Sequence, residues 1–207
     1  MKFFKKINIG LVLTIIVLLA VVIYSINVEN NRKNSKEDIK KACENFIEIS
    51  NKYSILPTEY QVIGEDGKNV DLSAYYSEIK NELNKITTNE SATNIQKNII
   101  SDNLESQLLN TSSFITEFNK KIVKITSYSF DGNQVSVTFN TKTTVKQKYQ
   151  DINSETGEPI EKVKESSFDN EDESITLERK DGNWKIVCGN LSYSADNSLM
   201  YNSGYMF

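Results

Sequence analysis

Three patterns in the sequence predict an α+β fold carried on one N-terminal transmembrane helix. Residues 7–26 form an apolar run without a charged side chain. Apolar residues recur at helical spacing from residue 35 to about 109, and at the two-residue spacing of strands after about residue 120. Because the helices precede the strands instead of alternating with them, we expect about three helices packed on a curved antiparallel sheet of about four strands.

The apolar run reads INIGLVLTIIVLLAVVIYSI. At a rise of about 1.5 Å per residue it reaches about 30 Å, the thickness of the hydrocarbon core of a bilayer. Residues 27–31 offer no small-residue cleavage site, and no cysteine follows the run, so neither a cleaved signal peptide nor a lipoprotein anchor fits. An uncleaved single-pass helix is the favoured interpretation.

The expected topology is a cytoplasmic tail (1–6), the membrane helix (7–26), a polar stalk (27–34) and an extracytoplasmic domain (35–207). Lysine and arginine flank both ends of the run, so the positive-inside rule supports this orientation only weakly. The excess of lysine over arginine and the many asparagines and isoleucines are typical of a low-GC Gram-positive bacterium. We expect the cell membrane as the location, with the N-terminus in the cytoplasm.

Three helices are expected in the domain. Ser35 and Asp38 approximate a capping box for the first helix, which should end before Pro57. The second helix should follow Asp71, and the third should cover about 91–109. The apolar stripes are Ile39, Ala42, Cys43, Phe46 and Ile49 in the first helix, Leu72, Tyr75, Tyr76, Ile79, Leu83 and Ile86 in the second, and Ile95, Ile99, Ile100, Leu104 and Leu108 in the third.

Two Asp-Gly pairs predict β-hairpins. Residues 122–130 and the alternating 134–139 are joined at Asp131-Gly132, and residues 174–180 and 184–188 are joined at Asp181-Gly182. Asp-Gly supplies the positive φ angles of tight turns. Between the hairpins, residues 151–173 hold nine acids and two lysines. We expect this segment to form two strands joined by a solvated tip.

Composition excludes several functions. The chain has no histidine, so no mechanism can use imidazole as base, proton shuttle or metal ligand. The formal net charge is −4 although the N-terminal tail is basic, and a nucleic-acid partner would need a positive surface. We expect no cofactor, no metal and no nucleic acid as a partner.

The layout over about residues 36–193 resembles the nuclear-transport-factor-two-like (cystatin-like) superfamily, whose helices fill the concave face of a bent sheet. The closing hairpin, ITLERKDGNWKIV at 175–187, is the local piece most similar to it. One anchor followed by one such domain is also similar to the bitopic scaffold proteins of type IV secretion and conjugation channels. The resemblance implies binding of envelope proteins or self-association.

Two other functions stay open. A small-molecule binding or sensing cone would be lined by Tyr60, Tyr76, Tyr128 and Trp184, although aromatic residues are more often core. An isomerase- or dehydratase-like enzyme without histidine would use an acid beside a tyrosine, with Glu59, Tyr60 and Asp71 as candidates. Asp71 is equally suited to cap the second helix. We assign no catalytic residue.

Three remaining features each have two interpretations. The acids in 169–173 could bind Ca²⁺, but they lack the EF-hand register, so a solvated turn is favoured. Cys43 and Cys188 could form a disulfide, although free core thiols are favoured. The tail 193–207, with Tyr201 and Tyr205, is either a last strand or a surface that meets a partner.

Overall fold

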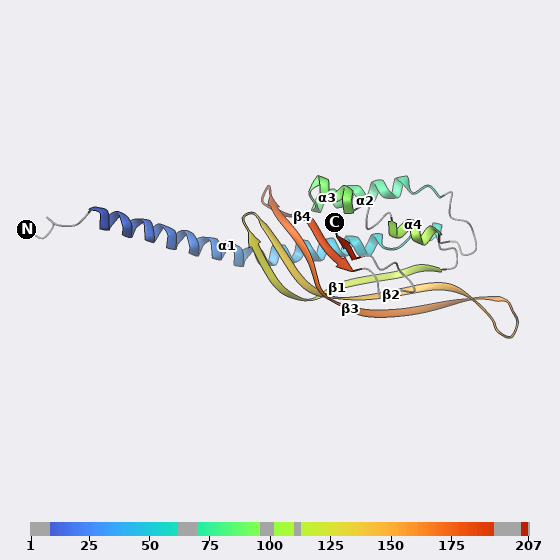
Figure 1. Cartoon of the computed structure of the whole chain (residues 1–207). Coiled ribbons are helices and arrows are strands. Elements are labelled where there is room, and N and C mark those ends of the chain that lie inside the picture. The colour runs from blue at the N-terminus through green and yellow to red at the C-terminus, as the bar shows by residue number, and fades with distance from the viewer. Residues whose placement is uncertain (1–8, 62–69, 96–101, 110–112, 193–203, 207) are drawn as a thin grey trace, which may run out of the picture. The chain divides into compact units, whose positions relative to one another are not determined.

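The structure, a computed structural model, describes residues 9–61, 70–95, 102–109, 113–192 and 204–206. The chain divides into two compact units, Met1–Lys40 and Lys41–Phe207. The described part is α+β, with a long N-terminal apolar helix, short helices and an open antiparallel sheet (Figure 1). This is the fold class that the sequence predicts.

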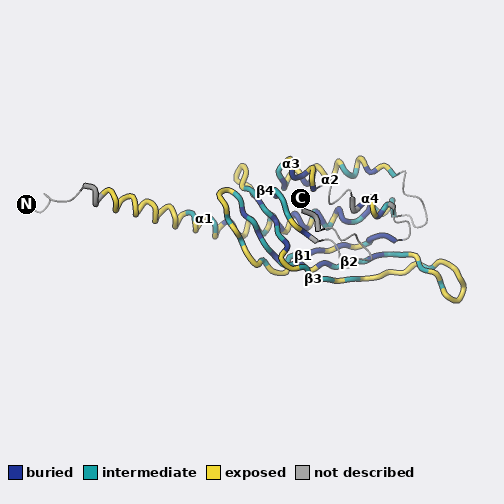
Figure 2. Tube along the Cα trace, in the orientation of Figure 1, coloured by how far each residue is buried: buried dark blue, intermediate teal, exposed yellow. Residues whose placement is uncertain are grey.

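The first helix, α1, is continuous from Ile9 to Tyr53. It is the one described helix that is long and apolar enough to cross a membrane. Its described apolar residues up to Ile26 are exposed, with Leu18 59% and Tyr24 71% exposed (Figure 2). An exposed apolar surface of this length is what a membrane-spanning helix presents to lipid.

The predicted helix start at Ser35 is wrong, because Ser35 lies inside α1. Its hydroxyl donates to the carbonyl of Asn31 at 2.7 Å, one turn back in the same helix. A serine can make this bond within a helix as readily as it caps one. Residues 27–53 contain no glycine or proline, so nothing in the polar segment breaks the helix.

Shorter helices follow. A single 3-10 turn, η1 (Thr58–Tyr60), precedes α2 (Ser73–Ile86). The region of the third predicted helix contains α3 (Asn89–Ile95) and α4 (Asp102–Leu109), and its expected core residues Ile99 and Ile100 lie outside the described residues. The helical side of the core is formed by buried apolar side chains of α1 from Lys41 onward and of the shorter helices. They are Cys43, Phe46, Ile47, Tyr53, Leu72, Ile79, Leu83, Ala92, Ile95 and Leu104.

The sheet is an antiparallel meander in the order β1-β2-β3-β4-β5. Its long strands are β1 (Ser113–Asp131), β2 (Gln134–Ile152), β3 (Pro159–Lys180) and β4 (Asn183–Ser192), and β5 (Gly204–Met206) is short. Strand β1 begins about nine residues earlier than its sequence pattern indicates. Alternate residues of the strands are buried on one face, which supplies the sheet side of the core, namely Phe114, Phe118, Val135, Val137, Phe139, Ile175, Leu177 and Ile186.

Both predicted hairpin turns are confirmed. Gly132 has φ +58° between β1 and β2, while Asp181 and Gly182 have φ +51° and +81° between β3 and β4. These are the left-handed conformations that tight hairpins need. The predicted excursion is also a hairpin, because β2 and β3 pair as far as Ile152 and Pro159 around a turn at 153–158.

The β2–β3 hairpin extends beyond its neighbours (Figure 1). In β2, the residues from Gln134 to Tyr149 pair with β1. Residues 150–152 of β2 and 159–161 of β3 therefore pair only with each other. Strand β4 pairs with β3 only between Ser174 and Lys180. Among the described strands, β3 therefore has no neighbour on its outer edge from Pro159 to Glu173. We call this segment the free β3 edge.

Candidate functional site

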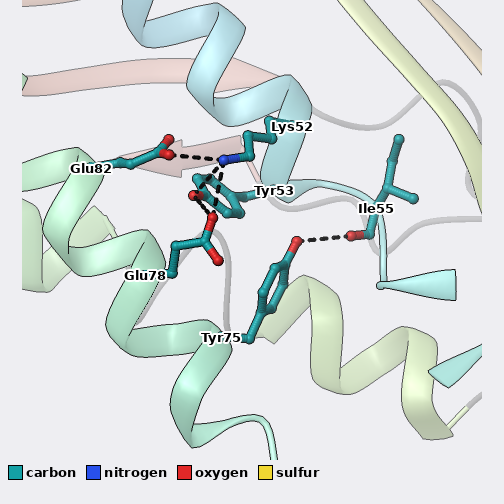
Figure 3. A network of polar contacts seen from close by, with 6 residues as sticks. All are labelled: Lys52, Tyr53, Ile55, Tyr75, Glu78 and Glu82. Carbon is teal, nitrogen blue, oxygen red and sulfur yellow. Dashed lines mark hydrogen bonds and ion pairs between the residues drawn. The ribbon is translucent and has the colours of Figure 1, made fainter. Parts of the chain in front are cut away.

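One polar cluster joins the end of α1 to α2 (Figure 3). The Lys52 ammonium lies 3.1 Å from Glu78 Oε1 and 2.8 Å from Glu82 Oε1. It also donates to the Tyr53 hydroxyl at 2.9 Å, and that hydroxyl donates to Glu78 at 3.0 Å. The ring of Tyr53 packs edge-on against Tyr75, with 5.5 Å between the ring centroids. We call these five residues the surface network.

The protonation states of the surface network suit a structural role, which is to hold the end of α1 to α2, rather than proton transfer. Burial raises the pKa of Tyr53 and of Tyr75 to about 12, so both phenols stay neutral near pH 7. Hydrogen bonds from Lys52 and Tyr53 lower the pKa of Glu78, which keeps this acid ionised. A general acid or base needs a pKa near the working pH, and none of these three shifts moves a group toward it.

A second cluster is buried under the sheet. The Lys120 ammonium on β1 lies 2.7 Å from Glu173 Oε1 on β3, and the two side chains are 0% and 3% exposed. Thr141 Oγ1 on β2 donates to Glu173 Oε2 at 2.5 Å. Burial lowers the pKa of Lys120, and the Glu173 carboxylate opposes that shift. We call these three residues the buried cluster. A paired charge is the one form in which such groups are tolerated inside a protein.

A β-bulge turns Glu173 toward the interior. Phe139 pairs with Glu173 and Thr141 pairs with Asn170, so two residues of β3 lie opposite the single Asn140. The second of them, Asp172, has φ +55°. Bulges re-aim side chains in this way. Among the described residues no three acids or cysteines lie close enough to hold a metal ion, and Asp169, Glu171 and Asp172 are exposed while Glu173 is buried.

Asn51 binds the edge of β1 beside the buried cluster. Its Nδ2 donates to the Lys120 carbonyl at 2.9 Å, and the Lys120 amide donates to its Oδ1 at 3.0 Å. The side-chain amide of α1 therefore takes the place of a neighbouring strand at this residue. This pair of bonds fixes the end of α1 to the strand that carries Lys120.

The four predicted lining residues lie on four different elements. Tyr60 is in η1, Tyr76 in α2, Tyr128 in β1 and Trp184 in β4, and each is half-buried. Strands β2 and β3 lie between the strands of Tyr128 and Trp184. The ring of Tyr128 stacks with Phe130 of its own strand at 6.5 Å. The tyrosines that do meet from separate elements are Tyr53 and Tyr75.

The candidate acids for catalysis are at the surface. Glu59 is exposed on η1. Asp71 is exposed, and its carboxylate accepts the backbone N–H of Ser73 at 2.9 Å, which lowers its pKa. The cap position of α2 is Leu72, one residue after the position expected from sequence. An ionised, solvated acid in such a turn has a structural role.

The cysteines and the tail have definite places. Cys43 on α1 is buried and Cys188 on β4 is half-buried, and both are free thiols. Burial raises the pKa of Cys43 to about 12, which keeps it protonated and unreactive. In the tail, Gly204–Met206 pair with β4 as β5, while Tyr201 lies outside the described residues.

Sequence reasoning missed the buried cluster, although a signal exists. Glu173, Ile175 and Leu177 alternate along one face of β3, so the acid occupies a position that the strand pattern reserves for core residues. On β1, Lys120 lies two residues after the buried Phe118, so it also occupies a position on the core face of its strand. Charged residues in phase with core residues are the pattern that could have found this cluster.

Comparison of the chain with models of known protein families and with curated protein sequences gives no match.

Proposed function

We propose that the chain is a membrane-anchored protein whose domain associates with a second copy of itself along the free β3 edge. The observation that carries this proposal is the edge itself, which leaves the outward backbone groups of alternate residues between Pro159 and Glu173 without a strand neighbour among the described strands. Unpaired strand edges bind other strands readily, and proteins normally shorten or cover them.

The direction of the backbone groups along β3 fixes which pairings are possible. The Asn153 N–H donates to the Glu158 carbonyl, so the even-numbered β3 residues from 160 to 170 turn their backbone groups toward β2 and the odd-numbered residues turn theirs outward. Two copies that pair antiparallel along this edge must therefore place outward residues opposite outward residues. Centred on Ser166, such a pairing places no like charges opposite each other within residues 162–170.

Other registers are disfavoured by charge. Residues 161–165 read Glu-Lys-Val-Lys-Glu in both directions, so a pairing centred on Val163 would place like charges opposite each other. A pairing centred on Lys162, Lys164 or Glu165 would place that charge opposite its own copy. Because the matched segment, residues 162–170, is short, we expect association to depend on the anchor, which concentrates the chains in one membrane.

Two single substitutions of Ser166 test the proposal. The S166K chain places two positive charges opposite each other at the centre of the matched segment, and the S166E chain places two negative charges there. Neither should associate with itself, but a mixture of the two should associate, because the central pair is then opposite in charge. Energy transfer between donor- and acceptor-labelled full chains in lipid vesicles measures this.

The control is E155K, which reverses an exposed charge in the turn outside the matched segment. It should transfer energy as the unaltered chain does. Equal transfer in the S166K, S166E and mixed samples would contradict the proposal.

The family, the location and the wider role are part of the same proposal. An α+β domain on one apolar helix supports a cystatin-like scaffold outside a Gram-positive cell, with a conjugation or secretion channel as one assembly that needs such a scaffold. Protease added to intact cells should digest the domain. A domain that resists until the cells are lysed would contradict the external location.

A further inference from the structure

We propose that Lys120 and Asn170 form an intramolecular isopeptide bond, with Glu173 carrying protons during the reaction. This would join β1 to β3, which are separated by β2 in the sheet. The inference concerns the interior of the domain and does not depend on the free β3 edge.

The first support is the position of Asn170. It lies directly opposite Thr141 in the β2–β3 pairing, and residues directly opposite share a face with Cβ atoms about 5 Å apart. The hydroxyl of Thr141 is bonded to Glu173, whose other oxygen is bonded to the Lys120 ammonium. The bulge brings Asn170 and Glu173 to one face, although three positions separate them in sequence.

The second support is an unsatisfied amide. Asn170 Nδ2 is buried and has no hydrogen-bond partner among the described residues. A buried donor without a partner is costly because it has given up its hydrogen bonds to water, so native proteins seldom keep one without a reason. Loss of this nitrogen as ammonia would remove the cost.

The third support is the environment of the amine. An ammonium must lose a proton before it can attack a carbonyl carbon, and the completely buried position of Lys120 favours the neutral amine. Phe118 lies two residues before Lys120 on β1, and Phe139 is paired with Glu173 across β2 and β3. These rings are 5% and 0% exposed, and they help to exclude water from the cluster. The adjacent Glu173 carboxylate can accept the proton.

The chemistry balances without a further reactant. Glu173 takes a proton from the Lys120 ammonium, and the neutral Nζ attacks Cγ of Asn170. The new C–N bond forms as the bond from Cγ to Nδ2 breaks, and the proton held by Glu173 passes to the departing nitrogen. A second Nζ proton then follows through the same carboxylate, so the departing nitrogen leaves as ammonium. The products are a secondary amide, which keeps one of the original Nζ protons, and an ammonium ion, while the Glu173 carboxylate is regenerated.

The mass of the purified full chain tests this directly. We expect the intact mass to lie below the sequence mass by one ammonia, and a protease digest to contain the peptide of Lys120 joined to the peptide of Asn170. The Asn170→Ala chain, which keeps the ion pair of Lys120 and Glu173, should have its full sequence mass. Asn119→Ala, an exposed neighbour of Lys120, should still lose ammonia.

Two results would overturn the inference. One is a folded, unaltered chain whose intact mass equals its sequence mass. The other is a loss of ammonia without the joined peptide, which would assign the loss to another residue. Folding of each sample is checked separately by the fluorescence of Trp184, the one tryptophan of the chain.

Discussion

Lys120, Glu173 and Asn51 show how the interior of this domain depends on polar residues. The first two form an ion pair without exposed surface, and the third bonds both backbone groups of Lys120. The sequence pattern could place Lys120 and Glu173 on the inner face of their strands, but not opposite each other. Their contact depends on a bulge and on a pairing register that a single sequence does not encode in any local signal.

Replacement of Asn51 by alanine should destabilise the domain by about 2 kcal/mol, because two hydrogen bonds to the edge of β1 are lost at a partly buried position. Urea unfolding of the full chain in detergent micelles, followed by Trp184 fluorescence, measures the change. Asn119→Ala, at an exposed position on the same strand, should change stability by less than about 0.5 kcal/mol. Equal effects of the two substitutions would show that the side chain of Asn51 does not hold the edge.

Elements set by local chemistry were predictable from sequence. Both Asp-Gly turns, the helical stripe ending near Tyr53 and the long β2–β3 hairpin agree with the structure. The ends of helices and strands that lack a local signal could not be predicted from sequence. Ser35 has the chemistry of a cap but lies within α1, and the early part of β1 lacks the alternation that would have marked it. The described parts of the predicted third helix, α3 and α4, are helical as expected.

Substitution of Gly182 tests how much the left-handed turn between β3 and β4 contributes to the stability of the domain. Gly182 has φ +81°, and a Cβ added there would meet no atom within 4 Å. Gly182→Ala should therefore cost about 1–2 kcal/mol from backbone conformation alone. Gly182→Asn should cost less, because asparagine tolerates the left-handed region. Urea unfolding of both variants measures the difference, and an alanine variant as stable as the asparagine variant would contradict this explanation.

The whole molecule combines an apolar helix with a sheet in which β3 has an open outer edge over much of its length. The hydropathy of residues 7–26 was enough to predict the helix, since membrane spans depend on length and composition. The free β3 edge could not be predicted, because it depends on which strands stop short of their neighbours. The aromatic lining expected for a binding cone belongs to four separate elements, whereas the edge is one continuous feature.

Disulfide trapping between two chains tests the account most directly. The full chain carries S166C in a Cys188→Ser background and is oxidised in lipid vesicles. The matched register places Ser166 opposite its own copy, so we expect a disulfide-linked dimer. V123C, at an exposed valine on β1, replaces S166C as the control. An S166C chain that yields no more linked dimer than this control would contradict association along the free β3 edge.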